Sequence, residues 1–161
     1  MCRIWDRLSL ALQDRYHLIA IDQRGHGDSS WPQAPEYGTD DYVGDLEAVI
    51  DALRLDRFAL VGLSMGGVNA MAYAARHPER VTRLVVVDIR PAINPDKRPG
   101  LAQAKATAEN GHPVLPSLDA AFNLRKLTHP YTSDEAIQHH VEYQCKQLED
   151  GRWTYKQDPA I

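Results

Sequence analysis

The stretch that decides the fold is Gly62-Leu63-Ser64-Met65-Gly66, a serine with a glycine two residues away on each side. The apolar run 58–61 before it predicts a buried strand, and residues 68–75 after it follow a helical pattern. A serine at such a strand-to-helix turn can be held out of the sheet, with its hydroxyl exposed for attack on a carbonyl carbon. The pattern therefore makes Ser64 a candidate nucleophile.

The residues around Ser64 support this interpretation. The glycines let the chain turn tightly around a strained residue without Cβ clashes. Gly67 is expected to allow close packing of the helix on the sheet, and Val68, Met71, Ala72 and Ala75 are expected to share the packed face. The start of that helix directs N–H groups at the position where negative charge would develop on a substrate oxygen. The alternative interpretation is an ordinary turn in which Ser64 only caps the helix.

Composition predicts a globular protein with one domain's length of chain. The 161 residues are 43% hydrophobic and 25% charged, which is typical of a soluble domain rather than a disordered chain. The net charge of −4 provides no basic surface for nucleic acid or an anionic membrane. Cys2 and Cys145 lack the spacing of a disulfide framework or a metal site. We therefore expect free thiols in a reducing cytoplasm, no cofactor, no metal, and neither nucleic acid nor membrane as a partner.

Helix and strand patterns alternate through the first ninety residues. Residues 4–12 predict a helix, and residues 17–21 predict a strand that ends at Asp22. Thr39 is expected to cap the next helix. Asp22 also begins a turn, where its side chain is expected to bond the backbone that follows.

A last apolar run, residues 81–87, predicts another buried strand that ends at Asp88. Strands that alternate with helices favour a parallel sheet covered on both faces. Ligands of such sheets bind beyond the carboxyl ends of the strands, where Asp22, Ser64 and Asp88 are all expected.

The alternation of strand and helix patterns stops after Asp88. Prolines break the chain at Pro91, Pro95 and Pro99, and no further strand run is evident. Three helices are predicted, over residues 101–109, over residues 118–127, and from a cap at Ser133 through Cys145 to Leu148. Residues 91–161 therefore form a helical appendage, whose Phe122, Tyr143 and Trp153 would either line an apolar pocket or simply pack.

Four stretches together resemble a known family. They are Asp22 to Ser29 with its Arg-Gly-His-Gly core, Gly62 to Gly67, Arg76 to Arg80, and Val85 to Asp88. In order and spacing they resemble the α/β-hydrolase superfamily, and within it the capped bacterial esterase-like members. The resemblance implies an α/β fold class: a partial α/β-hydrolase core over residues 1–90, with a parallel sheet flanked by helices, and a helical cap over residues 91–161.

The resemblance also implies roles for single residues. Ser64 would be the nucleophile and the backbone N–H of Met65 one oxyanion donor. Some members take their catalytic acid from the strand end that Asp88 occupies here, while the alternative role for Asp88 is to anchor the loop into the cap. The second oxyanion donor, the catalytic histidine and the usual acid belong to segments not found within these residues. The resemblance thus implies an internal fragment that lacks the first and the C-terminal strands, with a gap in its sheet between residues 17–22 and 57–62.

The histidines within the chain are weaker candidates for the base. His26 lies in a loop that, in the family which this chain resembles, supports the edge of the sheet. His77 follows a helix C-terminus, where a partly cationic imidazole is favourable. His139 and His140 are neighbours on a helix and point about 100° apart, which favours solvated or packing roles over chelation of one ion.

These observations lead to a functional hypothesis and its alternatives. The expected activity is hydrolysis of a small-molecule ester or similar activated carbonyl through an acyl-Ser64 intermediate. One alternative is a non-catalytic ligand-binding or remnant protein of the same fold. Another is a truncated chain without activity of its own, whose unpaired strand edges would promote aggregation. The sequence does not determine the oligomeric state.

Overall fold

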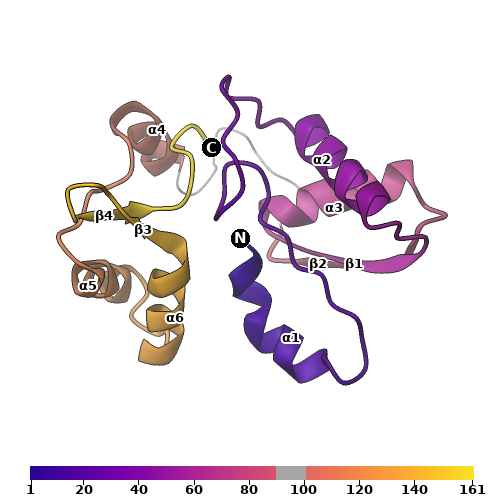
Figure 1. The fold of residues 1–161 in the computed structure, drawn as a ribbon, viewed down its shortest axis with the longest axis horizontal. Coiled ribbons are helices and arrows are strands. Elements are labelled where there is room, and N and C mark those ends of the chain that lie inside the picture. Colours follow the sequence, from indigo (N-terminus) through magenta and orange to yellow (C-terminus); the bar gives the residue numbers. More distant parts are fainter. Residues whose placement is uncertain (90–100) are drawn as a thin grey trace. The chain divides into compact units, whose positions relative to one another are not determined.

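The described residues form two compact units. The computed structural model describes residues 1–89 and 101–161, without the side chains of residues 101–104. One unit, here called the cap unit, contains residues 1–33 and 102–161, and the other, here called the elbow unit, contains residues 34–101 (Figure 1). The expected breaks at Pro91, Pro95 and Pro99 and the expected domain boundary at residue 90 lie outside the described residues. The division into 1–90 and 91–161 stays a prediction.

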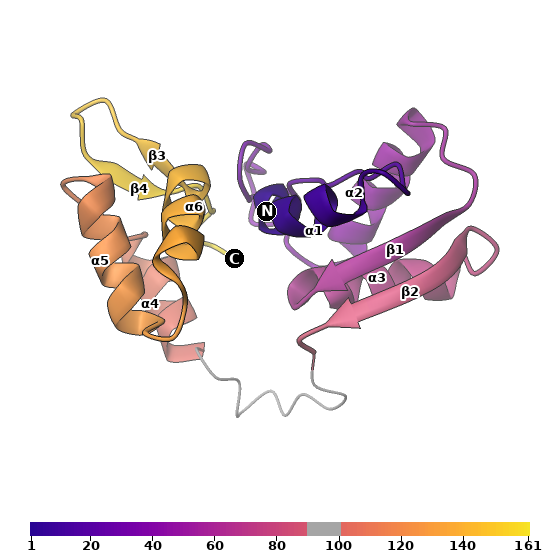
Figure 2. The same cartoon turned by 90° about the horizontal axis from the view of Figure 1, so that it is seen from below.

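The elbow unit is built on two parallel strands. Its elements are α2 (Thr39–Ala52), β1 (Phe58–Leu63), α3 (Met65–Arg76) and β2 (Val81–Val87). The strands β1 and β2 point the same way and end together, with Leu63 in register with Val87 (Figure 2). Helix α3 is the crossover between them and packs on both strands, and α2 packs on α3. The predicted order of strand, elbow, helix and strand is confirmed.

The core of the elbow unit lies where α2, α3 and β1 meet. Val43, Ile50 and Tyr73 are buried, and each such side chain contributes about 1.5–3 kcal/mol relative to exposure. At the rim, His77 Nε2 lies 2.7 Å from Glu47 Oε1, which joins the end of α3 to α2.

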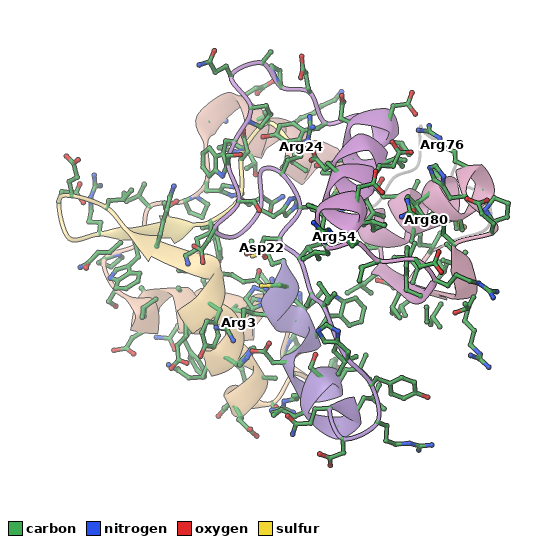
Figure 3. The ribbon with its side chains drawn as sticks, turned by 45° about the vertical axis from the view of Figure 1, so that its right-hand side comes forward. Arg3, Asp22, Arg24, Arg54, Arg76 and Arg80 are labelled. Atoms are coloured by element: carbon green, nitrogen blue, oxygen red, sulfur yellow. The ribbon has the colours of Figure 1, made fainter. Side chains whose placement is uncertain are left out.

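Two arginines tie the same elements together. Arg76 pairs with Asp40 on α2. Arg80 donates to the Leu55 carbonyl at 2.8 Å and to Asp51 at 2.9 Å (Figure 3). These contacts hold α2 against α3 and the start of β2.

The packed face of α3 and the burial of the strands differ from expectation. The buried residues of α3 are Gly67, Asn69, Ala70 and Tyr73, whereas Met71 is 40% exposed. Ala72 of the expected face does pack against the core, but the buried face is different, because α3 is enclosed by α2 as well as by the strands. Val85 is 47% exposed, so the expectation of a buried β2 was also wrong. Among the described elements of this unit, each strand pairs with one neighbour, so the other edge of each strand is unpaired.

The start of α2 is also shifted by one residue. Gly38 is the N-cap and Thr39 is the first helical residue, so the expected Thr39 cap was wrong. The carboxylate of Asp41 accepts a hydrogen bond from the Gly38 N–H at 2.8 Å, which satisfies the backbone at the helix start.

The cap unit contains the N-terminal helices and the second half of the chain. Its elements are η1 (Cys2–Trp5), α1 (Asp6–Leu12), α4 (Leu101–Asn110), α5 (Leu118–Thr128), α6 (Asp134–Gln144), β3 (Cys145–Gln147) and β4 (Trp153–Tyr155). The expected strand at residues 17–21 is absent from the described structure. A strand is defined by its ladder of hydrogen bonds, and the described residues offer this segment no ladder partner.

The C-terminal region is not purely helical. The third helix ends at Gln144, because Cys145–Gln147 instead pair with Trp153–Tyr155 in an antiparallel hairpin. Cys145 is buried with Ala121, Ile137 and Val141, and Phe122 and Trp153 pack against this cluster. The packing role is therefore confirmed for Phe122 and Trp153.

A hydrogen-bonded loop joins the beginning and the end of the cap unit. Gly27 N–H donates to the Lys156 carbonyl at 2.7 Å, and Asp158 N–H donates to the Gly25 carbonyl at 2.8 Å. Lys156 Nζ lies 2.7 Å from Asp28 Oδ1.

None of the helices in the described part of the chain combines the length and the apolar character that a membrane span requires.

Asp22 organises the turn before this loop. Its carboxylate accepts hydrogen bonds from the N–H of Cys2 at 2.6 Å and of Asp28 at 3.1 Å, so the expected backbone bonding is confirmed (Figure 3). Burial acts to raise the pKa of Asp22, but these hydrogen bonds outweigh it and leave the pKa below its ordinary value. A Cβ on Gly27, whose φ is +60°, would lie 2.2 Å from the Asp22 carboxylate.

Candidate active site

Ser64 occupies a strained turn between β1 and α3. Its backbone has φ 52° and ψ −124°, a region that non-glycine residues rarely adopt, and its side chain is exposed. The Ser64 N–H donates to the Val87 carbonyl on β2 at 2.9 Å, and the Ser64 carbonyl accepts from Gly67 N–H at 2.9 Å. Such a conformation costs about 1–3 kcal/mol and persists only where the surroundings enforce it.

The Ser64 side chain does not cap the helix. Its hydroxyl makes no cap hydrogen bond, although Ser64 holds the N-cap position of α3. The serines that begin α5 and α6 do cap: Ser117 accepts from Ala120 N–H at 3.1 Å and Ser133 from Ala136 N–H at 3.3 Å. The alternative interpretation of Ser64 as a simple capping serine is therefore wrong.

Two glycines make the turn sterically feasible. A Cβ on Gly62 would lie 2.3 Å from the Gly66 carbonyl oxygen and 2.6 Å from the Cα of Gly67. A Cβ on Gly67 would lie 2.8 Å from the Ile89 side chain and 3.1 Å from that of Val86. The expected close packing of α3 on the sheet is confirmed, and no larger residue fits at position 62 without moving the backbone.

The N-terminus of α3 offers donors next to Ser64. Gly67 and Val68 donate to the Ser64 carbonyl at 2.9 Å and 3.2 Å. Met65 begins the helix, so its N–H precedes these bonds and has no acceptor within the helix. The positive end of the helix dipole adds to the attraction for an oxyanion at this point.

Asp88 follows β2 as Ser64 follows β1. Leu63 is in register with Val87, so Ser64 and Asp88 occupy neighbouring positions just beyond the paired strand ends. Asp88 is exposed and has a φ of 56°, so both residues adopt the left-handed region. The structure thus brings two of the expected strand-end residues together, while Asp22 belongs to the other unit.

His77 is not placed to act as a base for Ser64. His77 lies at the other end of α3, about 18 Å away for a helix of this length, and bonds Glu47. His26 Nδ1 lies 3.1 Å from the Arg24 carbonyl, and burial lowers the pKa of its imidazole. The His77 contact joins α3 to α2, and the His26 contact lies within its own loop. Residues 34–89 contain no histidine other than His77.

One buried polar residue on α3 was not expected. Asn69 is 2% exposed, and its Nδ2 has no hydrogen-bond partner among the described residues. Its neighbours Val68 and Ala70 suggested only an apolar helix, so the sequence pattern carried no signal for it.

Residues 3–160 match the family described as the alpha/beta hydrolase fold. This chain belongs to the α/β-hydrolase family. Its sequence is 27% identical to that of the esterase Rv0045c of Mycobacterium tuberculosis, over 96% of this chain and 52% of that protein. It is 38% identical to the 2-(acetamidomethylene)succinate hydrolase of Mesorhizobium japonicum, over 56% of this chain and 32% of that protein.

Solved structures agree with this assignment. A crystal structure of E-2-(acetamidomethylene)succinate hydrolase superimposes with a TM-score of 0.86 at 28% identity, over 99% of this chain and 57% of that chain. The Mycobacterium tuberculosis esterase superimposes with a TM-score of 0.81 at 27% identity, over 99% of this chain and 55% of that one. The predicted α/β-hydrolase fold class is confirmed. The chain spans about half the length of the esterase relative and of these solved chains.

Proposed function

We propose that the protein containing these residues is a serine hydrolase that cleaves a small-molecule ester or similar activated carbonyl. The observation that carries the proposal is Ser64: an exposed hydroxyl on a strained strand-to-helix turn, without a capping role. The names of the relatives, an esterase and a succinate-derivative hydrolase, support the same reaction class.

The proposed reaction has two steps. Ser64 Oγ attacks the carbonyl carbon and passes its proton to a general base, while the N–H of Met65 stabilises the oxyanion. The tetrahedral intermediate collapses, and the leaving alcohol takes the proton from the base. A water molecule then attacks the acyl-Ser64 carbonyl with help from the same base, which releases the acid and regenerates the serine. In this proposal the base is a histidine from outside residues 34–89.

Asp88 is proposed as the acid that orients this base. Its position beside Ser64, its exposure and its positive φ support the role. A cytoplasmic location is also part of the proposal and is supported by Cys2 and Cys145, which are both free thiols.

Asp88→Asn tests the acid role. Asparagine tolerates the left-handed backbone, so the fold should be kept. We expect kcat to fall by about 10³-fold, with a shift in the pH profile, because the base loses its orienting charge. The exposed Asp56 provides the matched control, and Asp56→Asn should leave kcat unchanged. A loss of stability in Asp88→Asn, at an unchanged pH profile, would instead favour the loop-anchoring role.

A fluorophosphonate probe tests the proposed function. We expect stoichiometric labelling of the intact protein, with the adduct mapped by peptide mass spectrometry to Ser64, because the probe reports an activated serine. Ser64→Ala should abolish labelling. Undiminished labelling of that variant would overturn the assignment, and tight binding of an ester without any labelling would point to the non-catalytic ligand-binding alternative.

A further inference from the structure

A small hollow in the cap unit is lined by hydrogen-bond donors. It has a volume of about 150 Å³ and lies between the N-terminal helices and α6. Its polar lining consists of Arg3, Arg7, His139, His140, Tyr143 and Gln144. No carboxylate lines it among the described residues. This composition suits an acceptor-rich ligand, because guanidinium groups have five N–H donors and no acceptor.

Arg3 is held in place by two contacts, which leave some of its N–H donors available. Arg3 Nη1 lies 3.3 Å from Asp6 Oδ2, and its guanidinium carbon stands 4.4 Å above the ring of Tyr143 (Figure 3). Asp6 Oδ2 also lies 3.0 Å from His139 Nε2, so it orients two residues of the lining. The ion pair with Asp6 uses Arg3 Nη1, and the Tyr143 contact uses the face of the guanidinium group. Neither contact uses the other N–H donors of Arg3.

Arg7 is the more available of the two arginines. Its Nη2 lies 3.1 Å from Glu135 Oε1, but the two side chains are 62% and 86% exposed. Exposed pairs of this kind contribute only about 0–1 kcal/mol, so a ligand anion can compete with Glu135 for Arg7.

Several cationic side chains lie near His140, and the carboxylates of Asp6 and Glu135 pair with three residues of the lining. Burial, followed by the charges of Arg125, His129 and His139, lowers the pKa of His140 to about 4. Arg3 and Arg7 face the same hollow from the N-terminal helices. The imidazole therefore stays neutral at ordinary pH, and a negative charge beside it would be stabilised rather than repelled.

We propose that this hollow binds a small oxyanion, a carboxylate or a phosphate, through the guanidinium groups of Arg3 and Arg7 and the imidazole of His140. Bidentate guanidinium contacts match the paired oxygens of both groups. The bound anion favours the protonated imidazole, so the affinity for an oxyanion that itself stays ionised rises as the pH falls toward the pKa of His140.

NMR titration of the His140 imidazole in the full chain tests this proposal. Sodium trifluoroacetate and sodium phosphate, which both stay anionic over the titration, are compared with sodium chloride at equal ionic strength. We expect the pKa of His140 to rise by about one unit in at least one oxyanion, because an adjacent negative charge stabilises the imidazolium. A rise with trifluoroacetate alone identifies a carboxylate site and a rise with phosphate alone a phosphate site, and both support the proposal. No rise beyond that in chloride overturns it.

Three variants separate binding from a purely structural effect. Arg7→Gln should weaken anion binding by about tenfold, because a charged hydrogen-bond donor is lost. Glu135→Gln should strengthen it by about threefold, because the competing carboxylate is removed. The exposed Arg15, which does not line the hollow, is the matched control, and Arg15→Gln should bind like the parent chain. Equal weakening by Arg7→Gln and Glu135→Gln would indicate general disruption and would also overturn the proposal.

Discussion

Ser64→Ala is expected to lower kcat/KM for p-nitrophenyl acetate in the intact protein by about 10⁴-fold or more, because the attacking oxygen is lost. The free energy of unfolding should change by less than about 0.5 kcal/mol, since the Ser64 hydroxyl makes no cap hydrogen bond. Steady-state kinetics and urea unfolding measure the two effects separately.

Ser117 supplies a control with the opposite result. Its hydroxyl caps α5 by accepting from Ala120 N–H. Ser117→Ala should therefore lower the free energy of unfolding by about 1 kcal/mol while the intact protein retains its kcat/KM. A Ser64→Ala variant that keeps its activity, or that loses stability as Ser117→Ala does, would refute the nucleophile role.

Gly62→Ala is expected to disrupt the turn around Ser64. The added methyl would lie 2.3 Å from the Gly66 carbonyl oxygen and 2.6 Å from Gly67 Cα, both of which are backbone atoms that cannot rotate away. Overpacking of this kind costs about 3 kcal/mol, and it displaces Ser64 as well. We expect a lower midpoint of thermal unfolding together with the loss of fluorophosphonate labelling.

Gly44 provides the matched glycine. It is exposed within α2, and a Cβ there would meet nothing within 4 Å. Gly44→Ala should raise the free energy of unfolding by up to about 1 kcal/mol, because alanine is the better helix former. If Gly62→Ala were as stable as Gly44→Ala, the close approach of position 62 to the backbone of Gly66 and Gly67 would be contradicted.

Local patterns predicted the elements that are stabilised locally. The strand predicted over residues 81–87 has the same first and last residues as β2, and Ser133 caps α6 as expected. Such features depend on apolar periodicity and on capping hydrogen bonds between near neighbours. The prediction continued the helix that begins at Ser133 as far as Leu148, whereas α6 ends at Gln144. The pairing of Cys145 with Tyr155 is a contact across ten residues, which periodicity does not reveal.

Burial and strand pairing could not be predicted in the same way. Apolar runs at residues 17–21 and 81–87 look alike in sequence, yet only the second forms a ladder in the described structure. Whether a strand exists depends on a partner, and whether its valines are buried depends on what covers them. Asn69 shows the same limit, since the enclosure of α3 by both α2 and the strands is a tertiary property.

The sequence by itself determined the family, the order of strand, elbow and helix around Ser64, and the identity of the candidate nucleophile. These follow from residue types at fixed spacing: glycines where no Cβ fits, and apolar runs of strand and helix period. The tertiary structure decided that Ser64 is strained and uncapped, that Asp88 lies beside it just after the neighbouring strand, and that Arg3, Arg7 and His140 share one hollow. Those relations join residues far apart in the chain, and only packing brings them together.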